Sequence, residues 1–325
     1  MELRNPPSLA IVVPCFNEEE VFFKTLKELE TVVHNLKEKL KVTNSSKIYF
    51  IDDGSSDNTW QQIRQACASQ SVIGVRLSKN KGHQNAVYAG LSATVEDVVV
   101  TIDADLQDDP INIEAMIDAY LAGNDVVYGV RSNRDSDSWF KRSTAQMYYK
   151  IMNAVGVDLI FNHADFRLMS RRVVNALHEY PEVNMFLRGI VRKIGFSSTI
   201  VEYERKVREH GESKYPLRKM LSFAWEGISS FSTAPLRAIT VLGLASSFAS
   251  LLVIAWVFII WVSGVETVPG WASILVPLLF IGSVQLLSLG VLGEYVAKIF
   301  QEVKNRPRFH VDERIDTYDS EKKEK

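Results

Sequence analysis

The sequence contains little cysteine. Only Cys15 and Cys67 occur among 325 residues, and neither has a second cysteine close by in a C-x-x-C arrangement. This scarcity argues against a disulfide framework or a cysteine zinc site and fits a reducing compartment. The first eight residues contain no apolar core, so we expect no signal peptide.

An excess of charge of one sign is also missing. The 37 basic and 39 acidic residues give a formal net charge of -2, which gives no indication of a nucleic-acid partner. No G-x-x-x-x-G-K-[ST], no G-x-G-x-x-G after the first apolar run, no H-E-x-x-H and no G-x-S-x-G is present. Their absence argues against a P-loop nucleotidase, a dinucleotide-binding enzyme, a zinc protease and a serine hydrolase.

Charged residues disappear from two long stretches near the C-terminus, between Arg237 and Glu266 and between Glu266 and Glu294. Each stretch exceeds the roughly 20 apolar residues that cross about 30 Å of hydrocarbon. We predict transmembrane helices at about 239–262 and 271–293. Arg237 precedes the first. Four basic residues follow the second: Lys298, Lys304, Arg306 and Arg308. By the positive-inside rule, both ends of the hairpin face the cytoplasm.

The first half of the chain alternates short Val- and Ile-rich runs with amphipathic stretches. The runs, which read as buried strands, are 9–13, 48–51, 72–77, 98–102 and 126–130. The stretches predicted as helices are 18–39, 58–69, 84–94 and 111–121. This alternation predicts an α/β fold with a mostly parallel sheet, whose ligands bind at the carboxyl ends of the strands.

A polar cluster follows each predicted strand, at 14–18, 52–56, 80–82, 103–107 and 131. In the fourth cluster, Asp103 and Asp105 are two residues apart, so on an extended chain their carboxylates point to the same side. Such oxygens suit Mg²⁺ or Mn²⁺ bridging phosphate groups, and Gln107 adds a neutral oxygen. In the second cluster, Asp52 and Asp53 fit either a turn with a helix cap or an acceptor for the imino proton of uracil.

The sequence becomes more helical after residue 138. We expect helices at 139–155 and 170–179 and a late strand at 199–207. The stretch 217–231 fits an amphipathic helix lying on the bilayer, or an ordinary surface helix. Residues 312–325 carry mixed charge and are predicted to be disordered.

Several motifs resemble a known family. VVPCFNE at 12–18, DDGSSD at 52–57 and DADLQ at 103–107 resemble glycosyltransferase family 2, whose GT-A fold is a Rossmann-like nucleotide-sugar domain. ADFRLMSR at 164–171, GESKY at 211–215 and GEYV at 293–296 resemble its polyprenyl-phosphate branch, which includes dolichyl-phosphate mannose synthases and bactoprenol glucosyltransferases. One departure is the Asp108-Asp109 pair, where relatives often carry His-Pro or Pro.

The resemblance implies four parts of the chain. These are a cytoplasmic GT-A catalytic domain at 1–215, an interfacial segment at 216–236, a two-helix transmembrane hairpin at 237–297 and a cytoplasmic tail at 298–325. It implies a multi-pass protein of the inner (plasma) membrane. The small residues Gly282, Ser283, Gly290 and Gly293 would let helices approach closely, and the resemblance suggests a homo-oligomer, a tetramer.

The implied reaction is inverting transfer of one sugar, glucose from UDP-glucose, to undecaprenyl or another polyprenyl phosphate, giving a β-linked product. Transfer of mannose, an N-acetylhexosamine or aminoarabinose is an alternative, as is a non-catalytic membrane scaffold. A processive polysaccharide synthase would require further spans and a Q-x-x-R-W motif, which the sequence lacks.

The resemblance also implies roles for single residues. Those implied to hold the uridine are Pro14, Phe16, Glu18 and Asp53. Asp103 is implied near the ribose and diphosphate, with Asp105 and Gln107 on the Mg²⁺ or Mn²⁺. The residues implied near phosphate groups are Arg131 on the donor side and Arg142, Arg208, Ser213 and Lys214 on the acceptor side. Asp165 is implied at the reaction centre, where with Asp103 and Asp105 it completes the catalytic acids. Asp165 fits a helix N-cap equally well, and Arg142 fits a solvated helix residue.

Overall fold

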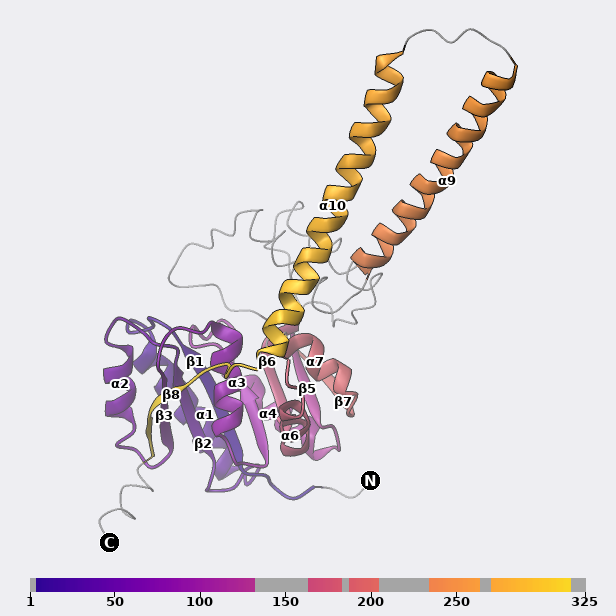
Figure 1. The fold of residues 1–325 in the computed structure, drawn as a ribbon. Helices are drawn as coiled ribbons and strands as arrows, with labels where there is room; N and C mark the ends of the chain where they lie inside the picture. Colours follow the sequence, from indigo (N-terminus) through magenta and orange to yellow (C-terminus); the bar gives the residue numbers. More distant parts are fainter. Residues whose placement is uncertain (1–3, 132–162, 183–186, 205–233, 264–269, 317–325) are drawn as a thin grey trace. The chain divides into compact units, whose positions relative to one another are not determined.

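The computed structural model describes residues 4–131, 163–182, 187–204, 234–263 and 270–316. The chain divides into two compact units (Figure 1). The first comprises residues 1–149, 158–214 and 306–325, and the second comprises 150–157 and 215–305. The C-terminal residues therefore belong to the first unit, although the second unit lies between them and the rest of it in the sequence.

The first unit is built on an eight-stranded sheet in the order β7-β5-β6-β4-β1-β2-β3-β8. The strands are β1 Leu9–Cys15, β2 Lys47–Asp52, β3 Val72–Leu77, β4 Val98–Thr101, β5 Val126–Arg131, β6 His163–Ser170, β7 Ser198–Tyr203 and β8 Val311–Ile315. The neighbours β1 and β2, β1 and β4, β2 and β3, and β5 and β7 are parallel. This confirms the predicted α/β fold and the five predicted strands of the first half.

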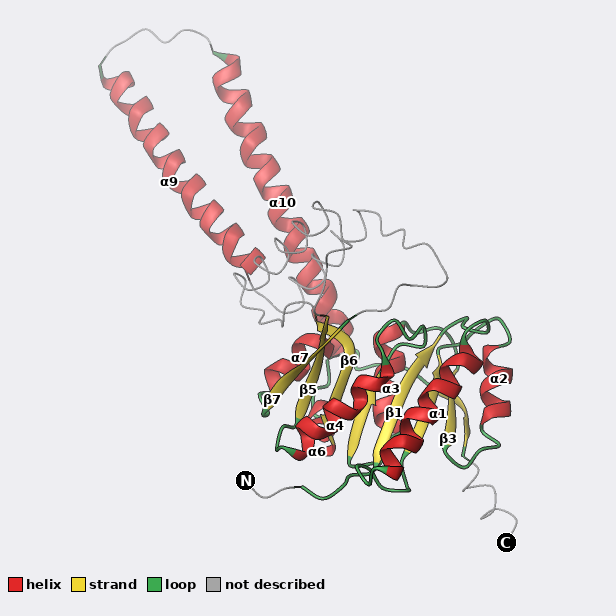
Figure 2. Ribbon diagram, turned by 180° about the vertical axis from the view of Figure 1, so that it is seen from behind, coloured by secondary structure: helices red, strands yellow, loops and turns green. Residues whose placement is uncertain are grey.

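Helices cover both faces of the sheet (Figure 2). On one face lie α1 (Phe22–Glu38), α2 (Thr59–Ala66) and α4 (Ile113–Leu121), the last preceded by the short 3-10 helix η1 (Pro110–Asn112). On the other lie α3 (His83–Ala93) and α6 (Arg171–His178), with α7 (Leu187–Ile194) packed on α6. Every residue of β1 is buried, as expected for a strand covered on both sides.

Strand β6 was not predicted. It lies between β4 and β5 and is antiparallel to both, with Thr101 opposite Arg167. Because it runs against its neighbours, its first residues lie at the edge where β4 and β5 end. The sheet therefore adds the start of β6, with Asp165, to the predicted rim of strand ends.

The prediction of a disordered C-terminal tail is wrong for residues 312–315. These residues belong to β8, which pairs antiparallel with β3 and covers that edge of the sheet. An exposed edge strand such as β3 leaves backbone groups that can pair with another segment, and here the chain's own C-terminal segment fills the position. Residues 317–325 lie outside the described part.

The second unit contains two long helices that contact each other, α9 (Ala234–Val262) and α10 (Trp271–Val303). Both are long and apolar enough to cross a membrane, with candidate spans Pro235–Val253 and Phe280–Val303 whose residues are not buried. This confirms two apolar C-terminal helices, consistent with a hairpin, and suggests membrane association. Helix α10 continues to Val303 instead of ending near 293.

Candidate functional site

A cleft of about 280 Å³ opens at the carboxyl edge of the sheet. Its lining comes from the ends of β1, β2 and β4, from the loop between β3 and α3 and from the first turn of α3. The residues are Pro14, Cys15, Phe16, Glu18, Asp53, Asn80, Gly82, His83, Ala86, Asp103, Ala104 and Asp105. The structure thus brings together six residues that the sequence placed in the site, although they are up to 91 positions apart in the chain (Pro14 to Asp105).

The two adjacent acids after β2 face different surroundings. Asp52 is fully buried, accepts a hydrogen bond from the Ser55 backbone N–H at 3.2 Å and lies 3.5 Å from the Arg76 guanidinium. Asp53 lines the cleft, and its two carboxylate oxygens accept the backbone N–H groups of Lys81 at 2.7 Å and Gly82 at 2.8 Å. Asp52 therefore serves the turn, and Asp53 fixes the loop between β3 and α3.

The same loop packs closely against Gly54. This glycine has φ +71°, and a Cβ at its position would lie 2.7 Å from the Asn80 backbone nitrogen. A side chain would collide with backbone that has no room to move, and the positive φ would add strain. The glycine therefore lets the loops after β2 and β3 meet at the cleft.

The loop after β1 is held by side-chain hydrogen bonds from the loop after β2. Asn17 adopts φ 56°, its N–H donates to Ser55 Oγ at 3.0 Å, and its side-chain oxygen accepts the Ser56 N–H at 2.9 Å. A left-handed conformation outside glycine is a form of strain often found at binding sites, and asparagine tolerates it well. These contacts place Phe16, 45% exposed, and Glu18 at the cleft.

The acidic loop after β4 contains Asp103 and Asp105, which both line the cleft. Leu106 has φ 46° and turns the chain so that the Gln107 side-chain amide donates to the Asp105 carboxylate. Burial, together with the neighbouring acids Asp165 and Asp105, raises the pKa of Asp103 to about 6 against the opposing charge of His83. Within the described part of the chain, no three His, Cys, Asp or Glu side chains cluster as a metal site.

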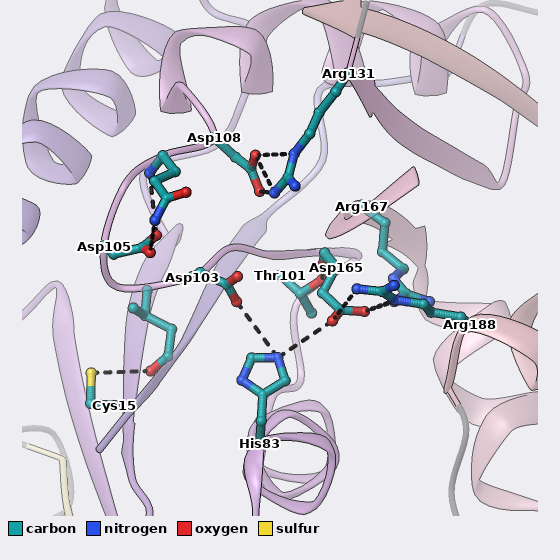
Figure 3. Close-up of polar contacts among 12 residues, drawn as sticks. Cys15, His83, Thr101, Asp103, Asp105, Asp108, Arg131, Asp165, Arg167 and Arg188 are labelled. Atoms are coloured by element: carbon teal, nitrogen blue, oxygen red, sulfur yellow. Dashed lines mark hydrogen bonds and ion pairs between the residues drawn. The ribbon is translucent and has the colours of Figure 1, made fainter. Parts of the chain in front are cut away.

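Arg131 lies at the end of β5 and forms an ion pair with Asp108 (Figure 3). Arg131 Nε and Nη2 donate to the two Asp108 carboxylate oxygens at 3.0 and 3.1 Å, and Asp108 is 2% exposed. Asp109 caps η1 by accepting the Ile111 N–H at 3.1 Å. The two acids that depart from the family pattern therefore have structural partners, and the predicted phosphate contact of Arg131 stays a prediction.

Asp165 is surrounded by three cationic or protonatable side chains (Figure 3). Its carboxylate lies 2.6 Å from Arg167 Nη2, accepts two hydrogen bonds of 3.0 Å from Arg188, and lies 3.6 Å from His83 Nε2. Burial opposes ionisation, but the hydrogen bond from His83 and the charges of Arg188 and Arg167 hold the pKa of Asp165 well below its usual range. The ionised form of Asp165 is therefore favoured, and because Asp165 lies inside β6, it does not cap a helix.

His83 and Arg188 were not predicted as site residues. His83 Nε2 lies 3.6 Å from both Asp103 and Asp165, so the first residue of α3 bridges the two acids. His83 directly follows the polar cluster predicted at 80–82 but was not part of it, so the only indication in the sequence was its position next to that cluster. Arg188 comes from α7, a helix that the sequence pattern did not indicate.

Four predicted acceptor-side residues lie outside the described part of the chain: Arg142, Arg208, Ser213 and Lys214. The predicted helices at 139–155 and 217–231 lie outside it as well. These assignments stay predictions.

A family pattern and curated relatives both point to a glycosyltransferase. Residues 10–177 match the pattern described as Glycosyl transferase family 2. An uncharacterized glycosyltransferase of Bacillus subtilis, YkoT, is 48% identical, with 98% of this chain and 94% of that protein covered. A bactoprenol glucosyl transferase of Shigella phage SfX is 41% identical, with 94% and 99% covered. Among solved structures, a mannosyltransferase from Pyrobaculum calidifontis in complex with GDP-Man and Mn²⁺ has a TM-score of 0.45 at 17% identity, with 93% and 88% covered.

Proposed function

Because the chain belongs to glycosyl transferase family 2 and is a glycosyltransferase with a GT-A, Rossmann-like domain, we propose that it transfers glucose from UDP-glucose to a polyprenyl phosphate. The observation that carries the proposal is the acid-lined cleft at the strand ends of a chain that aligns over nearly its whole length with bactoprenol glucosyl transferases. Transfer of another sugar to the same lipid is the second candidate.

The uridine part of the donor would enter between the loops after β1 and β2. Phe16 offers an exposed ring on which a base can stack, and Asp53 lies on the opposite loop with a carboxylate that accepts hydrogen bonds. Burial raises the pKa of Asp53, with two backbone N–H groups acting in the other direction. Asp103, which also lines the cleft, would then face the ribose and the diphosphate.

The side-chain oxygen atoms after β4 suit a hard divalent cation. Mg²⁺ in such sites is bound by one or two carboxylates together with substrate phosphates and water, rather than by a full set of protein ligands. Asp105, an exposed carboxylate, and the side-chain oxygen of Gln107 would hold Mg²⁺ or Mn²⁺, with Asp103 close by. When bound, the ion neutralises charge that develops on the departing nucleoside diphosphate.

In the reaction, an oxygen of the acceptor phosphate attacks the anomeric carbon of glucose. The new carbon–oxygen bond forms as the bond to the UDP oxygen breaks, so UDP leaves with both electrons of that bond. Attack opposite the leaving group inverts the configuration and converts an α-linked donor into a β-linked lipid product. A phosphate is already ionised near neutral pH, so the acceptor has little need of a general base.

Asp165 fits a positioning role better than that of a base. The charges of Arg188 and Arg167 and a hydrogen bond from His83 hold the pKa of this carboxylate well below its usual range, so it has little tendency to take a proton. Its contacts instead fix Arg188, whose side chain is 35% exposed, and His83 at the edge of the cleft. Asp165 would therefore orient the groups that surround the transferred sugar.

The lipid acceptor requires the catalytic unit to work at a membrane surface. We propose that α9 and α10 span the inner membrane as a hairpin with both termini in the cytoplasm, and that Arg142, Arg208, Ser213 and Lys214 receive the acceptor phosphate. Self-association of the hairpins into a tetramer is part of the proposal. Supporting features are the apolar length of the helices and the basic residues after α10.

The test is a transfer assay with purified protein, undecaprenyl phosphate, Mg²⁺ or Mn²⁺ and a panel of radiolabelled donors: UDP-glucose, UDP-N-acetylglucosamine, GDP-mannose and UDP-aminoarabinose. We expect lipid-extractable label from UDP-glucose, which mild acid releases as glucose. Label from another donor alone would support the second candidate. No lipid-linked label from any donor, with no donor binding by calorimetry, would support a membrane scaffold and refute both.

A further inference from the structure

After α10 ends at Val303, the chain returns to the sheet of the first unit. We call Arg308–Ile315 the C-terminal strap. It contains β8 and the three residues before it, and it contacts elements that lie more than 200 residues earlier in the sequence. A segment with mixed charge would be expected to stay in solvent, so its contacts call for an explanation.

The strap holds β3 through the backbone. β8 pairs antiparallel with β3 from Gly74 to Leu77, and the ladder continues with the Ser78 N–H donating to the His310 carbonyl at 3.0 Å. Ser78 directly precedes the loop that contains Asn80 and Gly82, two residues of the cleft wall. The strap therefore fixes one end of that loop.

The opposite end of the loop is held through α3. The Arg308 guanidinium lies 4.4 Å from the centre of the Tyr88 ring and donates a hydrogen bond of 2.6 Å to the Tyr180 carbonyl. The Phe309 ring packs edge-on against the Tyr88 ring, with 6.3 Å between the two ring centres. Tyr88 belongs to α3, the helix that begins with His83 in the cleft.

A third contact fastens the strap itself. One carboxylate oxygen of Glu313 accepts a hydrogen bond from Trp60 Nε1 at 3.2 Å and another from Arg64 at 2.7 Å, both on α2. Trp60 is 3% exposed and belongs to the core of the sheet unit. A specific side-chain anchor of this kind favours one register of β8 on β3.

We propose that the C-terminal strap is a positioning element of the donor site, which holds both ends of the loop between β3 and α3. Asp53 binds that loop from the cleft side through Lys81 and Gly82, and the strap holds β3 and α3 on either side of it. The inference rests on the proposed function, since it assigns the loop to donor binding. Loss of the strap's contacts loosens the loop, weakens binding of the nucleotide and leaves the chemical step intact.

The first test replaces Arg308 by Ala and compares it with Arg306→Ala. Arg306 is exposed and lies between α10 and the strap. Arg306→Ala therefore removes the same charge from a position close to Arg308. We expect Arg308→Ala to raise the donor KM and the Kd for UDP about tenfold, which corresponds to about 1.4 kcal/mol, with kcat unchanged within about twofold. Arg306→Ala should match the unaltered protein in both.

Hydrogen exchange of the free protein gives a readout that does not depend on the ligand. In Arg308→Ala, the amides of residues 78–83 should exchange faster, while those of β1 should be unchanged. Unchanged exchange at 78–83 together with unchanged UDP affinity would overturn the inference. If the unaltered protein bound no UDP, the proposed donor would be wrong, and the exchange data alone would decide about the strap.

A second pair of variants keeps the test decisive if Arg308→Ala fails to fold. Glu313→Ala removes the anchor to Trp60 and Arg64, whereas Asp312→Ala removes one carboxylate from an exposed position of the same strand. We expect Glu313→Ala to reproduce the weaker UDP binding and faster exchange at 78–83, and Asp312→Ala to show neither. Equal behaviour of the two variants would contradict the inference.

Discussion

Removing the Asp165 carboxylate should destabilise the protein mainly through what it leaves behind. The Arg167 side chain is 3% exposed and pairs with Asp165 at 2.6 Å, so Asp165→Ala buries an unpaired positive charge. Breaking a buried pair in this way costs about 3–5 kcal/mol. Arg188 is 35% exposed and can be solvated by water, so its lost ion pair should add about 1 kcal/mol or less.

The assay is thermal unfolding in detergent, followed by tryptophan fluorescence. At about 2–4 °C per kcal/mol for a unit of this size, the total of about 3–6 kcal/mol should lower the midpoint of Asp165→Ala by roughly 6–24 °C. The control Asp118→Ala removes a carboxylate that is 52% exposed and should have little effect.

The decisive variant is the double replacement Asp165→Ala with Arg167→Met, which removes the buried charge together with its partner. It should be more stable than Asp165→Ala alone, because the unpaired charge that remains, Arg188, is partly exposed and no unpaired charge stays buried. A midpoint for Asp165→Ala close to that of the unaltered protein would refute the reasoning, as would a double variant whose loss equals the sum of the two single losses.

Three further predictions follow from contacts of the sheet unit. Asp125, whose side chain is 1% exposed and pairs with Arg172, has its pKa lowered from 3.8 to about 2, against the effect of burial, by hydrogen bonds from partners such as Arg172. The ionised Asp125 should contribute about 2 kcal/mol to the free energy of unfolding above pH 4, and this contribution should be lost as the pH falls towards 2. In urea unfolding, Asp125→Asn should therefore be less stable than the unaltered protein at pH 7 but not near pH 2. Gly54→Ala should lower stability by about 1–3 kcal/mol and weaken UDP binding by calorimetry, because its Cβ would displace Asn80. His83→Ala should lower kcat at saturating donor about tenfold or more in the lipid-extraction assay, because Asp103 and Asp165, each 3.6 Å from the His83 ring, lose the group that bridges them. A kcat equal to that of the unaltered protein would contradict this role of His83.

The sequence was a good guide wherever burial alone decides structure. β1 and β4 are Val- and Ile-rich and buried on both faces, so their composition indicates parallel strands without further information. The polar residues directly after them could be placed at one edge because parallel strands end together. The cleft residues Glu18 and Asp103, which follow β1 and β4, were found in this way, as was Asp53 after β2.

The sequence was a poor guide where a segment depends on distant partners. β6 contains Asp165 and the buried Arg167, so it reads as polar, and it becomes a strand because the two charges pair with each other and with Arg188. β8 has the sequence VDERI and forms only because the edge of β3 and the side chain of Trp60 are available to it. His83 carries no signal of its own, since its partners come from β4 and β6.

The most direct test of a cation-dependent sugar-nucleotide site is calorimetric titration of UDP into the purified protein with Mn²⁺ or with chelator. We predict binding with Mn²⁺, loss of most of that affinity with chelator, and the same loss in Asp105→Asn, whereas Asp118→Asn binds like the unaltered protein. Equal UDP affinity with and without the cation, or unchanged binding by Asp105→Asn, would contradict the account.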